Sequence, residues 1–401
     1  MEVDGPVRAG REPIGGARAP TVWDVVVVGA GGAGLAGALA AAATGARVLV
    51  LDAAAGSEQG GATRHALALA LGWRPRSHGA LDVALTAGIP YQHAWLARHG
   101  VRFQGPPSVA QAPSSTHRFL LGGGLAMLTR LRAAAVASGV VLAPDCQVRA
   151  VLGDVADPSG VVVESAGRAE RVAARALLFA TGGAGAAAGK PALVPRPVDA
   201  SGLDALEAAG AATAGAPRAL VVPVDARAPR YDGGVVVRIA ASNASVCCDE
   251  TGTPLPLGGG EGALAAAIRA RPGGRAFAIW DASAPTPRIG LGAVRAAGLG
   301  ELGAQLGAPP GTLEAAANGR LRAPFVGVSL RAGALALDRG VLVDPLGRVR
   351  DRSGRPSGRL FAAGDLVAPA LVERGTDGLA PALVLGRVAG SAAAEAARST
   401  R

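Results

Sequence analysis

The sequence has 401 residues, enough for about two domains with buried cores. Half of the residues are hydrophobic and 17% are charged, a composition that excludes intrinsic disorder. Aromatic residues make up only 3%, which argues against a stacking surface for single-stranded nucleic acid. The net charge of +10 comes almost wholly from scattered arginines, since Lys190 is the only lysine, and we interpret it as compositional drift in preference to an anion-attracting surface. We expect no nucleic-acid partner.

The compartment is predicted from the first residues, the apolar runs and the cysteines. Residues 1–20 lack the apolar core of a secretory signal and are expected to form a disordered tail. Apolar runs of about 20 residues that would span a bilayer are absent from the sequence. Cys146, Cys247 and Cys248 have neither the pairing of a disulfide framework nor a CxxC metal spacing. These features predict a cytoplasmic protein without a structural metal.

A nucleotide-binding pattern begins at residues 23–28, where four valines predict a strand buried on both faces. Gly29, Gly31 and Gly34 follow at G-x-G-x-x-G spacing and lead into an alanine-rich helix. The first glycine permits a tight turn, the second lets the backbone approach a pyrophosphate, and the third lets the helix pack on the strand. A second apolar strand ends at Asp52, the expected ligand of the adenosine ribose. The predicted phosphate-binding turn also includes Gly32 and Ala33.

Three later segments favour FAD over NAD. Residues 60–65 form a glycine loop, residues 177–183 read as a strand that runs into a glycine turn, and residues 360–365 read as a strand that ends in an acid. An acid that returns from the far end of the chain suits the hydroxyls of a ribityl chain. The predicted cofactor contacts in these segments are Gly60, Gly61, Ala62, Thr63, Thr181, Gly182, Gly183 and Asp365. We add Val148, at the start of another predicted strand, and Gly378 and Leu379, where a helix N-terminus would face the flavin pyrimidine ring.

The four motifs, in this order, resemble the flavoprotein superfamily of fumarate reductase and succinate dehydrogenase, with Thr63 in place of a loop serine. Within it, the chain is most similar to tricarballylate dehydrogenase-like proteins. This likeness rests on GGATRH at 60–65, WLARHGVRFQ at 95–104, FLLGGG at 119–124 and VDARAPRYDGG at 224–234. The resemblance extends over residues 23–285 and 323–396.

The resemblance implies an α/β fold with a Rossmann-like FAD-binding domain built from both chain ends and an inserted, smaller α+β cap domain. The local patterns agree with it, and they include a helix at 202–210 for which Ser201 is the expected N-cap. We expect the FAD-binding domain to comprise 21–215 and 324–401, and the cap to comprise 216–323.

The activity that the resemblance implies is FAD-dependent dehydrogenation of a CH–CH bond in a small anionic substrate such as tricarballylate. Arg230 and Arg374 are candidate carboxylate anchors, since a guanidinium fork matches two carboxylate oxygens, and Tyr231 lies beside the first. His65 is a candidate to orient the flavin, to shuttle a proton or to carry the flavin covalently, with an ordinary loop histidine as the alternative. His117 is a candidate for the substrate cleft or for the surface.

Departures from the family pattern keep two other functions open. After Gly183 the chain lacks a segment rich in Arg and Asn, and its last FAD loop has Arg374 with no nearby histidine. One alternative is a ketosteroid-type desaturase, although such enzymes use active-site tyrosines and this chain has only Tyr91 and Tyr231. The other is a flavoprotein of reduced catalytic ability that binds FAD for structure or passes electrons to an acceptor protein.

Overall fold

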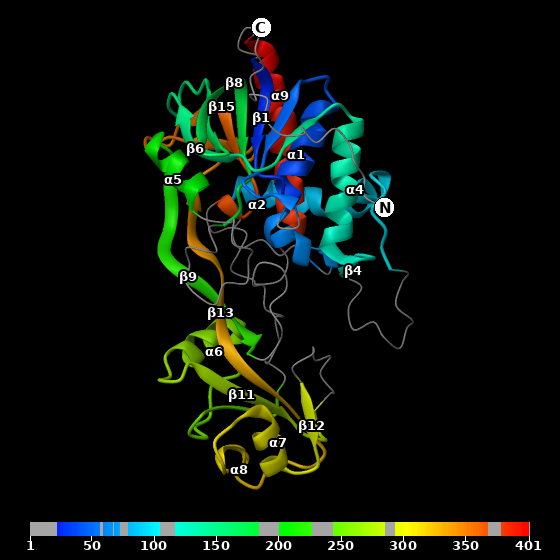
Figure 1. Cartoon of the computed structure of the whole chain (residues 1–401), viewed down its shortest axis with the longest axis vertical. Coiled ribbons are helices and arrows are strands. Elements are labelled where there is room, and N and C mark those ends of the chain that lie inside the picture. The colour runs from blue at the N-terminus through cyan, green and yellow to red at the C-terminus, as the bar shows by residue number, and fades with distance from the viewer. Residues whose placement is uncertain are drawn as a thin grey trace. The chain divides into compact units, whose positions relative to one another are not determined.

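The structure is a computed structural model that describes residues 22–56, 59–66, 68–72, 79–104, 117–183, 200–226, 244–284, 293–367 and 378–400. The chain divides into two compact units (Figure 1). Unit 1 comprises Met1–Ala187, Arg196–Arg218 and Leu337–Arg401, and unit 2 comprises Ala188–Pro195 and Ala219–Ala336. Unit 1 is therefore built from both ends of the chain, and the predicted fold class is confirmed. The domain limits that we derived from the sequence stay predictions.

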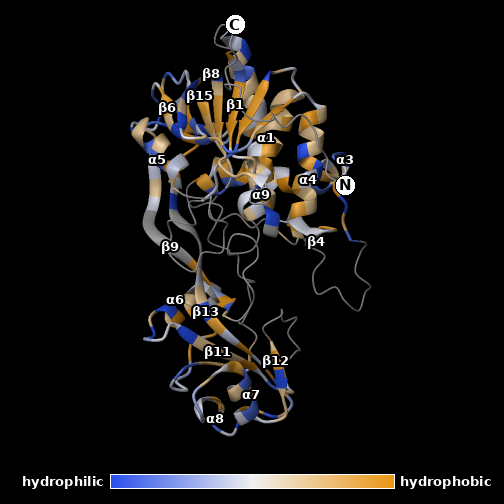
Figure 2. Cartoon of the chain, in the orientation of Figure 1, coloured by the Kyte–Doolittle hydropathy of each residue, from blue (hydrophilic) through white to orange (hydrophobic). Residues whose placement is uncertain are grey.

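Unit 1 contains a parallel sheet with strands in the order β15-β8-β1-β2-β5. The bounds of these strands are β1 (Trp23–Val28), β2 (Val48–Leu51), β5 (Val141–Ala143), β8 (Arg168–Phe179) and β15 (Pro356–Ala362). The central strands are apolar along their length because both of their faces are covered, and every residue of β2 is buried. Figure 2 shows this concentration of hydrophobic residues on the strands.

Three further strands extend the sheet in the antiparallel sense. They are β6 (Gln147–Leu152), β7 (Gly160–Ser165) and β14 (Arg348–Arg350). Strand β8 serves both parts, because residues 168–173 pair with β7 and residues 174–179 pair with β1. The carboxyl ends of β1, β2, β8 and β15 consequently lie at one edge of the parallel sheet, where ligands bind in open α/β folds.

Two long helices from opposite ends of the sequence pack together in unit 1 (Figure 1). They are α1 (Gly32–Ala42) and α9 (Leu379–Ser399). A Cβ at Gly390 would collide with the carbonyl oxygen of Gly37, and a Cβ at Gly386 would collide with that of Ala33. Glycines at these two positions therefore let the helix backbones touch, and this close approach brings the start of α9 to the start of α1.

The remaining elements of unit 1 are short, apart from one helix of four turns. They are the 3₁₀ helices η2 (Gly61–His65), η3 (Ile89–Tyr91) and η5 (Gly364–Leu366), the paired strands β3 (Ala68–Ala70) and β4 (His117–Phe119), and the helices α2 (Ala80–Gly88), α3 (Gln92–Arg98), α4 (Gly123–Ala137) and α5 (Ser201–Ala208). The predicted N-cap role of Ser201 is wrong. Ser201 is the first helical residue, Ala200 occupies the N-cap position, and the Ser201 hydroxyl accepts a hydrogen bond from Gln147 Nε2 at 3.5 Å.

Unit 2 contains a mixed arrangement of strands and helices. Its elements are β9 (Thr213–Asp225), β10 (Val246–Asp249), α6 (Gly260–Arg269), β11 (Arg275–Trp280), β12 (Val294–Ala296), α7 (Leu299–Leu306), α8 (Thr312–Ala317) and β13 (Phe325–Val341). Strands β9 and β13 also include residues of unit 1. The strands pair in the order β10-β11-β13-β12, and β9 also pairs with β13.

The two faces of this second sheet carry separate cores. Along β11, Ala278 and Trp280 pack in one cluster with Leu264 of α6, whereas Phe277 and Ile279 pack in another with residues of α7 and α8. The alternation follows from the two-residue period of a strand. It also separates the adjacent thiols of Cys247 and Cys248, which belong to different clusters and are free. Burial raises the pKa of each of these two thiols to about 12, so they stay protonated at neutral pH.

In the described part of the chain, no helix is long and apolar enough to cross a membrane.

Candidate functional site

The turn after β1 depends on two glycines for reasons internal to the fold. Gly29 has a φ of +105°, and a Cβ there would lie 2.5 Å from the carbonyl oxygen of Ala180. A Cβ at Gly34 would collide with the carbonyl oxygen of Gly29. The first glycine thus allows the left-handed turn, and the second allows α1 to approach β1 closely.

Gly31, between these two, has no such internal requirement. Its φ of −75° and ψ of −175° suit any residue, and a Cβ there would lie 3.8 Å from the Gly60 carbonyl oxygen and from Thr63 Oγ1. These are ordinary van der Waals distances. The protein's own packing therefore leaves room for a Cβ at this position, and a glycine here keeps the backbone at the start of α1 open to a ligand.

The glycine loop of residues 60–63 lies against the N-terminus of α1. The backbone N–H of Gly32 donates a 3.1 Å hydrogen bond to Thr63 Oγ1, which supplies the side-chain acceptor that Gly31 lacks. Gly60 adopts φ +103° and ψ −2°, a conformation that favours glycine. The loop is fixed from behind by α4, because the N–H of Gly124 donates to the carbonyl oxygen of Ala66 at 2.7 Å.

The returning end of the chain reaches the same place. Gly364, in η5 after β15, has a φ of +74°, and a Cβ there would lie 3.1 Å from the Cβ of Ala33. A Cβ at Gly378 would lie 3.4 Å from Asp365 Oδ1, and a Cβ at Gly32 would lie 3.4 Å from Leu379 Cδ1. The structure thus brings together three predicted groups of cofactor contacts, although they are separated by more than 300 residues in sequence.

Burial affects the carboxyl group of Asp365. Desolvation raises the pKa of this group to about 6 from its ordinary value of 3.8. A carboxyl group whose pKa lies close to neutral pH exists in both protonation states. It can accept a hydrogen bond from a ligand hydroxyl when ionised and donate one when protonated.

Asp52 lies immediately after β2 and is held by backbone bonds on both sides. Its N–H donates to Ala143, and its carbonyl oxygen accepts from the N–H of Cys146. The carboxylate Oδ1 accepts a 3.3 Å hydrogen bond from the N–H of Ala54, whereas Oδ2 is buried and has no hydrogen-bond partner among the residues described. Desolvation raises the pKa of Asp52, and the Ala54 hydrogen bond and the positive charge of Arg132 oppose this rise.

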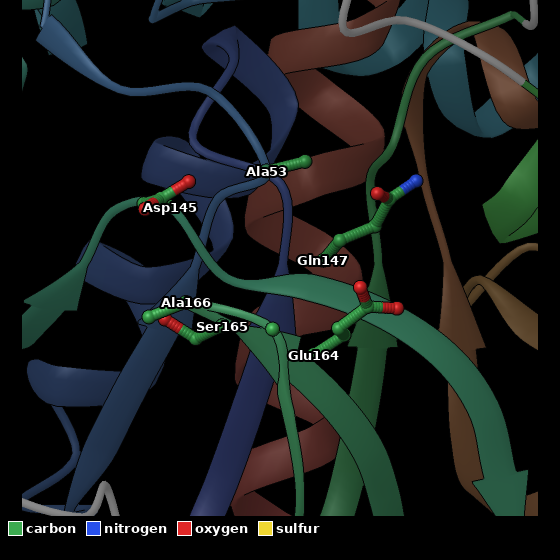
Figure 3. A pocket seen from close by; sticks show the side chains of 7 residues that line it. Ala53, Asp145, Gln147, Glu164, Ser165 and Ala166 are labelled. Carbon is green, nitrogen blue, oxygen red and sulfur yellow. The ribbon is translucent and has the colours of Figure 1, made fainter.

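A pocket of about 260 Å³ begins at Ala53, the residue after Asp52 (Figure 3). Its polar side chains are those of Asp145, Gln147, Glu164 and Ser165, with Gln147 and Glu164 on one side and Asp145 and Ser165 on the other. Glu164 Oε2 pairs with Arg149 Nε at 2.8 Å. Val148, a predicted cofactor contact, follows Gln147 in β6, where its side chain is buried and its backbone pairs with Val163.

The turn after β8 lies beside the turn after β1. The N–H of Ala180 donates to the carbonyl oxygen of Val28 at 2.8 Å, and Gly182 has a φ of +83°. Thr181 lies against Gly202 at the start of α5, where a Cβ would collide with the threonine side chain. Thr181, Gly182 and Gly183 therefore lie at the carboxyl edge of the parallel sheet, and their contact with a cofactor stays a prediction.

The predicted catalytic residues are located only in part. Arg230, Tyr231 and Arg374 lie outside the described residues. His65 is the last residue of η2, and His117 is the first residue of β4, where its backbone pairs with that of Ala70. The catalytic roles of these five residues stay predictions.

Sequence reasoning missed Arg132 and Arg64, both of which interact electrostatically in the neighbourhood of Asp52. Arg132 lies in the middle of α4, and only the packing of that helix brings it there. No local pattern identifies such a residue. The glycines of α9 did carry a pattern, because Gly386 and Gly390 are four residues apart and therefore share one helix face.

Comparison with known proteins identifies the family. The FAD binding domain family matches residues 66–375, so the chain belongs to this family. Its cofactor is FAD, and the chain is an FAD-dependent oxidoreductase. No curated protein matches the sequence.

Solved structures give the same fold. The open conformation of a flavocytochrome c3 fumarate reductase is similar with a TM-score of 0.74, at 18% identity, over 94% of this chain and 78% of that one. The 3-ketosteroid-Δ4-(5α)-dehydrogenase from Rhodococcus jostii RHA1 has a TM-score of 0.68, at 21% identity, over 94% and 98%. The 3-ketosteroid Δ1-dehydrogenase from Sterolibacterium denitrificans has a TM-score of 0.68, at 18% identity, over 94% and 100%.

The residues at the site fit FAD. Gly31 keeps the backbone accessible at a helix N-terminus, where phosphates bind, and the unpartnered Oδ2 of Asp52 is an acceptor of the kind that ribose hydroxyls require.

Proposed function

We propose that the chain is an FAD-dependent dehydrogenase or reductase that acts on a CH–CH bond next to a carboxylate, with tricarballylate as the first candidate substrate. The observation that carries this proposal is the convergence of α1, the 60–63 loop, residues 364–365 and residues 378–379 on one site. The fold similarity to a fumarate reductase adds support. When bound, FAD supplies an acceptor for the two electrons and one hydrogen that a C–H bond releases as hydride.

In this proposal the protein's residues bind the cofactor and the substrate. Gly31, Thr63 and the first turn of α1 hold the pyrophosphate, Asp52 holds the adenosine ribose, and Asp365 holds the ribityl chain. The remaining predicted contacts are Gly29, Gly32, Ala33, Gly34, Gly60, Gly61, Ala62, Val148, Thr181, Gly182, Gly183, Gly378 and Leu379.

The substrate side of the proposal rests on the sequence. Arg230 and Arg374 anchor the carboxylates, and Tyr231, His65 or His117 accepts the proton that leaves with the second C–H bond. An anionic substrate follows from the two arginines and from the likeness of residues 224–234 to tricarballylate dehydrogenase-like proteins.

A ketosteroid-type desaturase is the second candidate. The chain covers 98% and 100% of the two ketosteroid dehydrogenase structures, compared with 78% of the fumarate reductase, so their lengths agree better. The small number of tyrosines disfavours the desaturase, because such enzymes use active-site tyrosines. Tyr91 is 69% exposed, which leaves only Tyr231 as a candidate active-site tyrosine.

A substrate panel separates the candidates. The purified protein is mixed with an artificial electron acceptor and with tricarballylate, succinate or 4-androstene-3,17-dione, and acceptor reduction is followed by absorbance. The proposal predicts reduction with a carboxylic acid and none with the steroid. Turnover of the steroid alone would select the second candidate, and no turnover of any compound by a protein that holds FAD would favour the electron-passing flavoprotein.

A further inference from the structure

Two buried polar atoms, an acceptor after β2 and a donor on α4, belong to side chains whose charges interact. One is Oδ2 of Asp52 and the other is Nη2 of Arg132, and neither has a hydrogen-bond partner within the described ranges. Buried polar atoms in native proteins nearly always have a partner. Two such atoms in one neighbourhood therefore call for one explanation.

The surroundings place Arg132 at this site. A Cβ built at Gly60, in the glycine loop, would lie 3.7 Å from Arg132 Nη2 and would collide with Leu128, one turn earlier in α4. The charges of Arg132 and Asp52 interact, and that of Arg64 also acts on Arg132. Although the charges are opposite, Oδ2 of Asp52 and Nη2 of Arg132 do not form a hydrogen bond with each other.

The chemistry of the two groups defines what fits between them. An ionised carboxylate only accepts hydrogen bonds, and a guanidinium only donates them. A hydroxyl group does both, so one hydroxyl satisfies both atoms at once. A phosphate oxygen would satisfy Arg132 but would repel Asp52, and an ammonium group would do the reverse.

We propose that Arg132 is a cofactor-binding residue that donates a hydrogen bond to the same adenosine ribose hydroxyl that donates to Asp52. This inference rests on the FAD site proposed above and adds to it a contact from a helix outside the glycine motifs. The pocket that begins at Ala53 gives room beside Asp52 for the rest of the adenosine.

The test measures the binding of FAD and of two analogues to the full chain after its flavin has been removed, by equilibrium dialysis. The analogues carry 2′-deoxyadenosine or 3′-deoxyadenosine in place of adenosine. Arg132→Met is expected to weaken FAD roughly 10- to 100-fold, because a hydrogen bond from a charged donor is lost. The same substitution should weaken the binding of one of the two deoxy analogues much less, because that analogue lacks the hydroxyl that Arg132 contacts. Equal weakening of FAD and of both analogues would overturn the proposal.

Two further variants exclude indirect effects. In an Asp52→Asn background, Arg132→Met should still weaken FAD, whereas no further loss would mean that Arg132 acts only through the charge of Asp52 and would refute direct contact. Arg130→Met is the matched control, since Arg130 lies on the same helix and is exposed, and it should leave all three affinities unchanged. Circular dichroism of each variant checks the fold.

Two results distinguish the role of Arg132 from the FAD site as a whole. A wild-type chain that binds no FAD would remove the site itself, whereas a wild-type chain that binds FAD and shows no coupling between Arg132 and a ribose hydroxyl would remove only the role of Arg132.

Discussion

Thr63 Oγ1 accepts a 3.1 Å hydrogen bond from the N–H of Gly32 and so joins the glycine loop to the first turn of α1. A hydroxyl has one hydrogen to donate in addition to the bonds that it accepts. The Thr63 hydroxyl can therefore cap the helix and, at the same time, donate to an oxygen of the pyrophosphate.

Thr63→Val tests this double role, because valine has nearly the same shape without the hydroxyl. We expect the free energy of unfolding to fall by about 0.5–1.5 kcal/mol, since the Gly32 N–H loses its acceptor. FAD should also bind more weakly to the valine variant. Thr63→Ser keeps the hydroxyl and should therefore keep both the stability and the FAD affinity close to those of the wild type. Urea unfolding without flavin and FAD titration measure the two effects separately. Unchanged FAD affinity in the valine variant would exclude the phosphate contact.

Gly31 and Gly34 should respond differently to the same substitution. Gly31→Val is expected to fold, because the protein leaves ordinary contact distances around a Cβ there, but to lose FAD, because the side chain would stand where the pyrophosphate approaches. Gly34→Val is expected to disrupt folding, since its side chain would collide with the Gly29 carbonyl. Circular dichroism and bound flavin per chain measure the two outcomes. A folded Gly31→Val protein with normal FAD content would contradict the assignment.

Asp365 should make the flavin-free protein less stable as pH rises. Its pKa is about 6 in the folded state and 3.8 ordinarily, so the folded state binds more protons between these values. The contribution of Asp365 to stability therefore falls from pH 4 to pH 6 and stays low above that range. Asp365→Asn should remove this loss and stabilise the protein at pH 7 by up to about 3 kcal/mol.

The control is Asp351, whose pKa is lowered in the folded state, whereas that of Asp365 is raised. The Ser353 hydroxyl and Arg355 lower the pKa of Asp351 to about 2, so Asp351→Asn should cost stability at pH 7 and less as pH falls below 4. Urea unfolding at pH 4, 5, 6 and 7 compares the two variants. A stability difference between Asp365→Asn and wild type that does not change with pH would show that burial does not shift this carboxyl group.

Arg230 and Arg374 are expected to anchor an anionic substrate. Alanine at either position should reduce kcat/KM roughly 10- to 150-fold, which corresponds to the loss of one charge-assisted hydrogen bond. FAD content should stay near normal because neither residue belongs to the glycine turn. Lysine should restore activity only in part, since it lacks the planar fork. Unchanged kcat/KM in both alanine variants would remove these residues from the site.

The nucleotide-binding turn was predictable because its determinants are local. Gly29, Gly34 and Asp52 follow strands whose valines and leucines identify them as buried, and the structure gives each glycine the geometry expected for the turn. The strand late in the sequence that ends at Asp365 does return to the nucleotide-binding sheet, where Gly364 lies against Ala33 of α1, and the role of Asp365 toward a ribityl chain stays a prediction.

Other features depend on packing, which a linear pattern does not contain. Arg132 approaches Asp52 only because α4 packs behind the glycine loop, and nothing near it in sequence distinguishes it from Arg130. Ser201 has the chemistry of an N-cap, but its hydroxyl bonds to Gln147 and the helix begins one residue earlier than expected. The two separate cores of unit 2 likewise follow from which helix covers each face of the sheet.

FAD binding is tested by the visible absorption spectrum of the purified chain, recorded before and after denaturation and separation of small molecules. We expect a yellow protein that carries close to one FAD per chain and releases it on denaturation. Colour that stays with the denatured chain and disappears in His65→Ala would establish covalent attachment, the alternative left open for that histidine. A folded, colourless protein that takes up no FAD, or that binds NAD in its place, would show that the glycine motifs do not form an FAD site.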